Sequence, residues 1–302
     1  MPSRLRHSVV RLGRSIVEMD TVDLVTRLTL VLIVLSDWVV GADWQFKMPL
    51  RLLAVAGLLV PGLHRSKTLW CLLAAVMSLK TLFHWWAQDN HVFLLTYWFL
   101  AVALALRLEE PSKPLATSGR LLIGLSFAFA VLWKGPLSPD FLDGTYFHYT
   151  FLTDSRFGDF AYLLGGVGDE LSRANSAAMR ELGSIRQSVE SIELESTTQV
   201  ARLAHLVTWW TVFIEGAAAL TFLWPYGRGL SRARHATLLL FAYTTYMAAT
   251  VETFGLTLLT IGLAQCEPEL RRTRLLYIGG CFLVLIYDYV PLLSFLRPLV
   301  PP

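Results

Sequence analysis

The chain has 302 residues, of which 54% are hydrophobic and only 16% are charged, and its formal net charge is +3. Soluble domains carry about 25% charged residues, whereas here long apolar runs separate clusters of charge. This composition excludes a disordered chain, a fibrous protein and a soluble enzyme with one core, and the small net charge gives no reason to expect nucleic acid binding. It indicates an all-α fold, a polytopic transmembrane helical bundle in a lipid bilayer.

The N-terminal segment is basic and amphipathic. Four arginines lie in the first 14 residues, and apolar residues recur at helical spacing from Leu5 to Ile16. We expect residues 1–23 to lie along the cytoplasmic surface of the membrane. A cleaved signal peptide is the alternative, because residues 40–42 resemble a cleavage site, but a polar lead of 23 residues is long for one.

Nine hydrophobic segments follow. They predict two membrane blocks, 24–134 with five segments and 206–295 with four, and a Pro-rich extracytoplasmic tail at 296–302. A perpendicular span needs about 20 residues, so the two shortest segments, 50–63 and 253–265, can be tilted, interfacial or re-entrant. The nine segments are 24–40, 50–63, 69–86, 91–106, 119–134, 206–224, 235–250, 253–265 and 275–295.

The short connections differ in basic charge. On the opposite side from the N-terminus they hold three basic residues, Lys47, Arg51 and Arg297. This excess on the N-terminal side predicts an integral cell membrane protein with a cytoplasmic N-terminus and an extracytoplasmic C-terminus. The N-terminal side holds fifteen, namely Arg4, Arg6, Arg11, Arg14, Arg65, Lys67, Arg107, Lys113, Arg120, Arg228, Arg232, Arg234, Arg271, Arg272 and Arg274.

Residues 135–205 form a long extracytoplasmic insertion with ten acidic residues and five arginines. Its first part, up to Asp159, is irregular and rich in aromatic residues. From Leu164 to Ile192, apolar residues recur every three or four positions, which predicts a long amphipathic helix over about 160–200. The apolar stripe of such a helix must be covered. It can pack on the membrane face of the bundle, bind a partner protein or a second copy, or act as a lid.

Polar side chains gather in the predicted outer half of the membrane. An ionisable group inside a span costs about 2.5–3.5 kcal/mol on insertion scales, so few are kept without a use. Lys80 and His84 are four residues apart and share a helix face. One polar pocket that opens outward would explain the whole set, which comprises Asp37, Lys80, His84, Asp89, Asn90, His91, Lys134, Glu215, Glu252 and Asp288.

Several of these residues also have a purely structural interpretation. Lys134 ends a helix, where a lysine stabilises the helix dipole and reaches water. His91 can cap the following helix, and Glu215 and Lys80 can belong to structural ion pairs. A metal site would have to combine His84, His91 and His148, which lack a ligand motif, so no metal is predicted.

Two strings resemble a known family. FHWWAQDNHVFLLTYWFLAVAL (83–104) and FAFAVLWKGPLSPDFLDGTYFHYTFLTDSRFGD (127–159) resemble the horizontally transferred transmembrane (HTTM) family, which includes the membrane part of vitamin K-dependent gamma-glutamyl carboxylase. Residues 209–225 and 234–265 are similar to the C-terminal helices of that family. The sharpest elements are the pair Asn90-His91 and the lysine that precedes the DFLDG turn.

This resemblance implies a membrane enzyme that uses a reduced quinone such as vitamin K. Lys134 would be the base that deprotonates the quinol, and His91 would assist it, with a peptide or small substrate modified at the outer face. Desolvation at the membrane edge favours the neutral amine that a base requires. We expect the supporting pocket to contain Asn90, Asp89, His84, Lys80, Glu215, Glu252 and Asp37.

A non-catalytic function is the alternative. The chain can be a transporter, or an export or maturation partner that holds another protein through the 160–200 helix. Transporters often contain repeated halves, and no convincing internal repeat is present here. The clustering of polar groups near the outer face, together with the resemblance, favours the enzyme.

Overall fold

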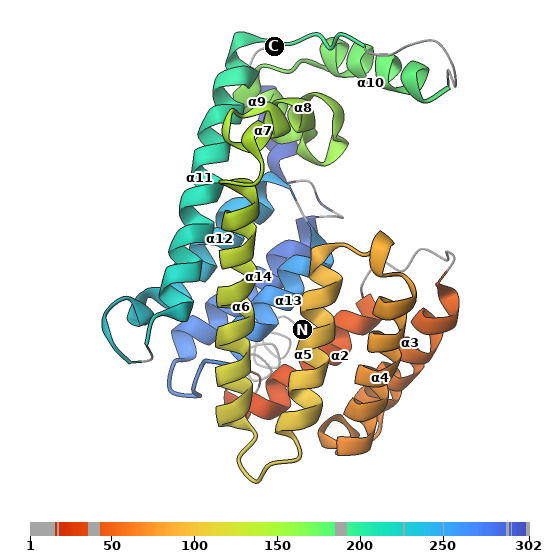
Figure 1. Cartoon of the computed structure of the whole chain (residues 1–302), viewed down its shortest axis with the longest axis vertical. Helices are drawn as coiled ribbons and strands as arrows, with labels where there is room; N and C mark the ends of the chain where they lie inside the picture. Colours follow the sequence, from red (N-terminus) through yellow and green to blue (C-terminus); the bar gives the residue numbers. More distant parts are fainter. Residues whose placement is uncertain are drawn as a thin grey trace, which may run out of the picture.

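The computed structural model describes residues 16, 18–35, 43–184, 192–225, 227–249, 251–287, 290 and 292–299, with the backbone alone at 181–184. Every regular element in these residues is helical, so the expected all-α fold is confirmed. Nine helices of this described part form a bundle, and α7 to α10 form a cap at one end (Figure 1). The bundle helices are α2 (Thr21–Leu35), α3 (Trp44–Leu59), α4 (Lys67–Phe83), α5 (Asn90–Ala105), α6 (Ser112–Lys134), α11 (Thr198–Leu223), α12 (Arg234–Ala248), α13 (Glu252–Leu263) and α14 (Arg271–Tyr287).

Each predicted apolar segment coincides with one bundle helix, but few of these helices are long. Among the described residues, α6 and α11 are long and apolar enough to cross a membrane. A third crossing results if α14 and the 3₁₀ segment η5 (Leu292–Leu299), which meet at 68°, are counted as one span. These helices give the chain the character of a membrane protein.

The other bundle helices are shorter than the apolar layer of a membrane. α5 has 16 residues and α13 has 12. At 1.5 Å per residue they measure about 24 and 18 Å, against about 30 Å of hydrocarbon. Nine full crossings therefore stay a prediction.

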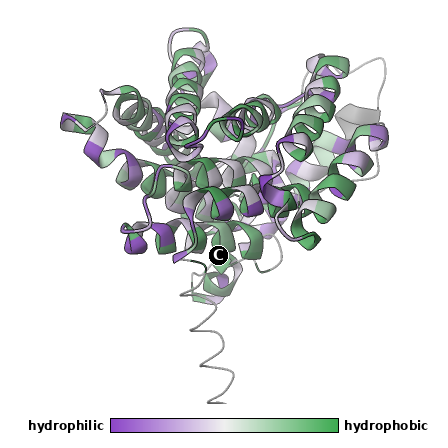
Figure 2. Cartoon of the chain, turned by 90° about the horizontal axis from the view of Figure 1, so that it is seen from below, coloured by the Kyte–Doolittle hydropathy of each residue, from purple (hydrophilic) through white to green (hydrophobic). Residues whose placement is uncertain are grey.

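Large apolar side chains cover the outward faces of the long helices. Phe129 on α6 and Phe213 on α11 are 64% and 65% exposed, respectively, and Leu220 is 59% exposed. Figure 2 shows hydrophobic residues on the outer as well as the inner sides of the helices. Soluble monomers rarely expose apolar surface on this scale, so lipid is the solvent that suits these faces.

Small residues bring neighbouring bundle helices close together. A Cβ atom at Gly255 would lie 2.9 Å from Tyr246 Cζ, and one at Gly262 would lie 2.7 Å from Leu238 Cδ2. The earlier glycine of α13 contacts the later residue of α12, and the later glycine contacts the earlier residue. The two helices are therefore antiparallel. They form a helical hairpin, in agreement with the two separate segments predicted at 235–250 and 253–265, and only glycine permits this approach.

A buried arginine joins the first and last bundle helices. Arg274 is fully buried at the start of α14. It donates to the carbonyl of Met19 at 2.7 Å, to the carbonyl of Cys266 at 3.0 Å and to the Thr21 hydroxyl. At the same end, Arg65 pairs with Asp20 at 2.5 Å. The connections that carry most basic residues therefore meet at one end of the bundle.

The cap has its own apolar core. Its elements are α7 (Pro139–Leu142), α8 (Thr145–Thr153), the 3₁₀ turn η3 (Ser155–Phe157), α9 (Gly158–Gly165) and α10 (Asp169–Ser184). Phe147 and Phe151 of α8 are buried with Ala161 of α9 and Val200 of α11. α11 runs along one side of the molecule, from the cap to the far end of the bundle (Figure 1).

The expected long helix over 160–200 is wrong as a single element. The chain breaks it at Gly166, which adopts φ +65°, a conformation that glycine accepts without strain. The next residue, Val167, turns inward and is buried. The periodic pattern continues across this break because α9 and α10 both face the same core. The part of the prediction at 185–191 lies outside the described residues.

α11 begins eight residues before the predicted span at 206. The Thr197 side chain accepts the N–H of Val200 at 3.1 Å and so caps a helix that starts at Thr198. Asn175 of α10, also buried, exchanges two hydrogen bonds of 2.9 Å with the backbone of Glu195. The connection into α11 is thereby fixed against the cap.

Candidate functional site

Lys134 lies where the bundle meets the cap. It is the last residue of α6, and Gly135 closes that helix by donating its N–H to the Val131 carbonyl at 2.8 Å. Pro136 follows and has no N–H with which to continue the helix. Lys134 therefore lies at the turn between α6 and α7, where the end of α6 fixes its backbone.

The amine of Lys134 turns into the molecule. It donates to Glu215 Oε1 of α11 at 2.5 Å, and it lies 5.3 Å from the centre of the Phe141 ring in α7. The side chain of Glu215 is 7% exposed and that of Lys134 is 26% exposed. The amine therefore lies next to a buried carboxylate and an aromatic ring.

The buried side-chain atoms without a hydrogen-bond partner in the described part of the chain include two oxygens on the neighbouring helices α11 and α12. They are Glu215 Oε2 and the Tyr246 hydroxyl of α12. Tyr246 lies on α12, which packs against α11. Buried polar atoms of this kind are normally satisfied by water or a ligand.

A second polar group surrounds Lys80 at the end of α4. Its amine lies 3.5 Å from Asp43 Oδ2 and 3.4 Å from Gln88 Oε1, and Lys47 pairs with Asp43 at 2.8 Å. Burial alone would raise the pKa of Asp43, but the hydrogen bond from Lys47 and the charges of Lys80 and Lys47 outweigh it, so the pKa is lowered. This group links the beginning of α3 to the end of α4.

His91 and its neighbours form the turn into α5. His91 Nε2 lies 3.8 Å from Asp89 Oδ2, and the imidazole centre is 6.4 Å from that of Phe254 in α13. Asp89 and Asn90 are exposed. Asn90 begins α5 and Asp89 is its N-cap residue, so His91 lies inside the first turn and does not cap the helix.

The remaining predicted site residues are His84, Glu252 and Asp37. The His84 ring packs edge-on against Phe46, with centres 5.9 Å apart, and its Nε2 atom is buried without a hydrogen-bond partner in the described chain. Glu252 is half-buried at the first position of α13. Asp37 lies outside the described residues.

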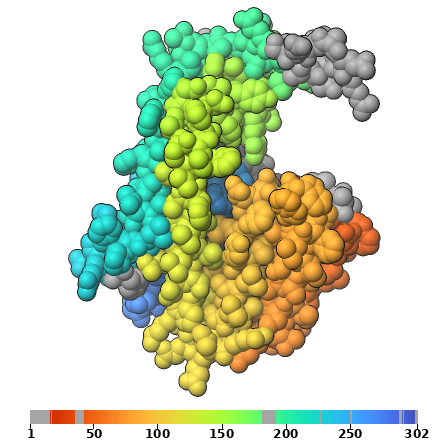
Figure 3. Space-filling model, viewed as in Figure 1, coloured from red at the N-terminus to blue at the C-terminus, as the bar shows by residue number. Residues whose placement is uncertain are grey.

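The predicted polar residues of the described part lie in one group around Lys134 and Glu215 and another around Lys80 and His91, and a single pocket containing both stays a prediction. Within the described residues, no hydrogen bond or ion pair joins Lys134 to His91. The first turn of α13 borders both groups, because Phe254 faces His91 and Gly255 faces the Tyr246 ring. Figure 3 shows a hollow between the end of α6 that carries Lys134 and the α4–α5 hairpin, with C-terminal helices at its back.

Sequence reasoning missed four members of these groups. Asp43 and Gln88 hold Lys80, Phe141 lies against Lys134, and Tyr246 neighbours Glu215. Phe141 stands inside the DFLDG turn and could have been included with it. The other three give no signal, since their roles depend on which helices pack together.

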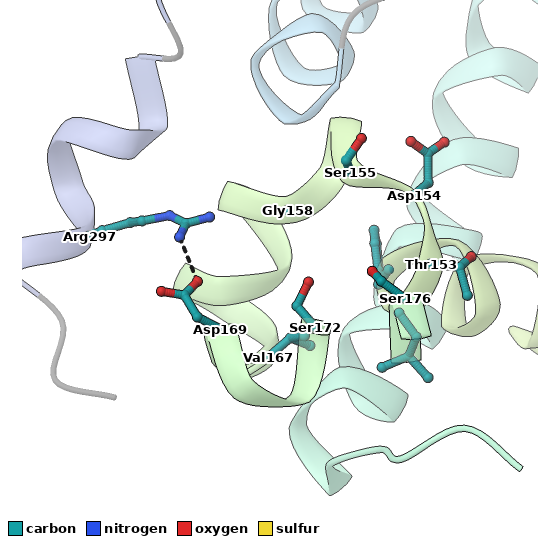
Figure 4. A pocket seen from close by; sticks show the side chains of 11 residues that line it. Thr153, Asp154, Ser155, Gly158, Val167, Asp169, Ser172, Ser176 and Arg297 are labelled. Carbon is teal, nitrogen blue, oxygen red and sulfur yellow. Dashed lines mark hydrogen bonds and ion pairs between the residues drawn. The ribbon is translucent and has the colours of Figure 1, made fainter. Parts of the chain in front are cut away.

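The structure contains two further concave sites. A cavity of about 60 Å³ in the cap is lined by hydroxyl and acidic side chains, with Arg297 of η5 bonded to Asp169 at its edge (Figure 4). An apolar groove of about 280 Å³ lies between α4 and α5 and ends at Arg107. In the part of the chain that the structure describes, no three His, Cys, Asp or Glu side chains gather in a geometry that could hold a metal ion.

We also compared the chain with known families, curated proteins and solved structures. No family model, curated protein or solved structure matches the chain significantly.

Proposed function

We propose that the nine bundle helices all lie within the membrane, with the N-terminus in the cytoplasm and the C-terminus outside. The fifteen basic residues of the connections on one side, against three on the other, support this orientation. The joining of Asp20 to Arg65, and of Met19 to Arg274, at one end of the bundle is consistent with it.

Single cysteines test this orientation. In a variant without native cysteines, Ser112→Cys should react with a membrane-impermeant maleimide only after the cells are opened, whereas Ser155→Cys should react in intact cells. Equal labelling of both in intact cells would contradict the proposal.

We further propose that this is an HTTM-like membrane enzyme in which Lys134 acts as a base toward a reduced quinone. One observation carries the proposal: the Lys134 amine is 2.5 Å from Glu215 Oε1 instead of extending into water. Glu215 can take a proton from the ammonium group and leave the neutral amine that a base requires. The resemblance of residues 83–104 and 127–159 to the family is the second support.

The residues around Lys134 suit a reduced quinone. Phe141 gives an aromatic wall beside the amine, and the hollow beside α6 gives a flat apolar molecule a route from the bilayer. Glu215 Oε2 is a buried acceptor still available for a hydroxyl group. When bound, a quinol supplies an acidic phenolic hydroxyl and reducing equivalents. Lys134 would take that proton and become an ammonium group beside the quinolate, while Glu215 keeps the proton it took from the ammonium group, and the Phe141 ring shields one side of the amine from water.

His91 and the Lys80 group serve this site from the far side of α13. Phe254 of α13 lies beside the imidazole, at 6.4 Å between ring centres. In the proposal, His91 assists at the mouth of the hollow, and Asp89, Asn90, His84, Lys80 and Glu252 maintain its polar rim. The substrate is a peptide or small molecule that approaches from the outer face.

Quinol-dependent oxygen consumption tests the enzyme. Purified protein in nanodiscs is given menadiol, a soluble naphthoquinol, and oxygen uptake is followed. Lys134→Gln keeps a donor toward Glu215 but removes the base, so the rate should fall by about 100-fold or more. Lys113→Ala, in an exposed ion pair with Glu110, is the matched control and should retain the wild-type rate.

A result with Lys134→Gln at the wild-type rate would contradict the enzyme. If wild-type protein shows no uptake and removal of α10 abolishes function in cells, the protein acts instead as a partner through its cap.

A further inference from the structure

A groove of about 280 Å³ runs between α4 and α5, which lie side by side in the bundle (Figure 1). Small or apolar side chains line most of it. Ala74 and Ala103 are buried at its floor, whereas Ala75 and Leu104 are exposed at its edges. The groove is therefore closed toward the core of the bundle and open to whatever surrounds the bundle.

The groove follows the antiparallel packing of these two helices. At one end, Arg107 Nη2 donates to Cys71 Sγ at 3.2 Å. Further along the pair, the Thr81 and Thr96 hydroxyls are 2.8 Å apart. The lining extends to Ser78 on α4, seven residues beyond Cys71. Seven residues rise about 10 Å in an α-helix, so the groove is a slot parallel to the helix axes, the shape of an extended hydrocarbon chain.

Two cations stand at one end of this slot. Arg107 lines the groove itself, and Lys67, the first residue of α4, lies one turn before the groove on the same helix face. Both are exposed, and neither forms an ion pair with a carboxylate among the described residues. Of the two acids that follow Arg107, Glu110 pairs with Lys113 at 2.6 Å, and Glu109 pairs with neither cation within the described chain. The end of the groove therefore offers positive charge to a ligand.

We propose that this groove binds an acyl chain of an anionic phospholipid, with the lipid phosphate held by Arg107 and Lys67. A guanidinium group can bind phosphate through two parallel N–H bonds, and the lysine adds a second charge. The inference rests on the proposed position of the bundle in the membrane and not on the quinol chemistry. In that orientation both cations face the cytoplasm, where the leaflet surface is negative and basic sites between helices bind lipid headgroups.

Native mass spectrometry tests the class of lipid. The full-length protein is released from nanodiscs that contain equal amounts of phosphatidylglycerol and phosphatidylethanolamine, and the wild type should retain one phosphatidylglycerol in preference. The double variant Lys67→Gln, Arg107→Gln should lower phosphatidylglycerol retention about tenfold or more and leave phosphatidylethanolamine unchanged. Lys113→Gln, which alters an exposed lysine of the same connection, is the control and should bind as the wild type does.

A second pair of variants tests whether the acyl chain occupies the slot. Ala75→Phe fills the groove from its exposed edge and leaves both cations in place, so phosphatidylglycerol retention should again fall about tenfold. Leu82→Phe is the control, because Leu82 is 69% exposed on the same helix but lies one turn beyond the groove. Retention that survives Ala75→Phe would reduce the site to charge attraction at the surface and overturn the proposal.

The cysteine labelling separates this inference from the proposed orientation. If Ser112→Cys is protected in intact cells and the wild type retains both lipids equally, the lipid site is wrong and the orientation stands. If Ser112→Cys reacts in intact cells and the preference for phosphatidylglycerol persists with both effects of substitution, the lipid site stands and only the orientation is wrong.

Discussion

Lys134 and Glu215 are 81 positions apart in the chain, and the amine of one lies 2.5 Å from the carboxylate of the other. Their meeting depends on the antiparallel register of α6 and α11. Nearer the other end of this helix pair, Arg120 donates to the backbone carbonyls of Phe222 and Trp224 at 3.2 and 3.1 Å. The register of one helix pair thus positions the candidate base.

Removing only Lys134 should destabilise the protein more than removing both partners. Lys134→Ala leaves the Glu215 carboxylate buried without its cation, at an expected cost of about 3 kcal/mol. The double variant Lys134→Met, Glu215→Met replaces the pair with apolar side chains and should recover most of that loss. Unfolding by denaturant in mild detergent measures both variants.

The exposed pair Lys113–Glu110 gives the control for this experiment, since Lys113→Ala should leave stability almost unchanged. A double variant that is less stable than Lys134→Ala would mean that the pair stabilises the bundle beyond compensating for the buried charge.

Arg297 should hold the cap to the C-terminal segment. It bonds Asp159 of α9 at 2.5 Å and Asp169 of α10 at 3.0 Å, and it lies 4.7 Å from the centre of the Tyr162 ring. Arg297→Ala should accelerate amide hydrogen exchange in α9 and α10 about tenfold, without a change in the bundle.

Arg156→Ala is the matched control for this test, because Arg156 bonds Asp154 only two positions away and joins no separate elements. Equal acceleration by both variants would show that Arg297 is not the residue that fastens the cap.

Stability should depend on the ionisation of Asp43. Because the folded state lowers its pKa, Asp43 stabilises the fold above the unfolded value of about 3.9. That contribution is lost as the pH falls from about 4 through the lower folded pKa. Melting temperatures of wild type and Asp43→Asn should therefore differ most at neutral pH and converge once the pH falls below the lowered folded pKa of Asp43. A constant difference would contradict the prediction.

The α12–α13 hairpin should not tolerate a side chain at Gly262. A Cβ atom there would lie 2.6 Å from Tyr277 Cε1 and 2.7 Å from Leu238 Cδ2. Gly262→Ala should cost about 1–3 kcal/mol by overpacking. Gly216→Ala on α11, where nothing lies within 4 Å, should be neutral or slightly stabilising. Similar losses in both variants would refute the close approach of the two helices.

The positions of the bundle helices follow from the sequence because apolar runs between charged connections leave few other choices. The residues at which the helices begin and end were less predictable. The start of α11 depends on the Thr197 cap, and the break at Gly166 leaves the apolar period intact. A periodic pattern reports which face is buried but not whether one helix or two present that face.

The sequence indicates which polar residues belong to the candidate site. It does not indicate which of them form ion pairs or hydrogen bonds with one another. Lys134 and Glu215 stand out because charge within an apolar run is rare. Asp43 lies 37 positions before Lys80, and Tyr246 resembles any aromatic residue on an apolar helix. Which carboxylate reaches which amine depends on helix register, which a single sequence does not specify.

Arg274 also has a consequence for the order in which the molecule is completed. The Thr21 hydroxyl that it binds is made 253 residues earlier, so α2 leaves the ribosome long before this partner exists. In a nascent chain that ends before α14, the start of α2 lacks the hydrogen bond from Arg274. The contact therefore distinguishes a chain that includes α14 from one that ends before it.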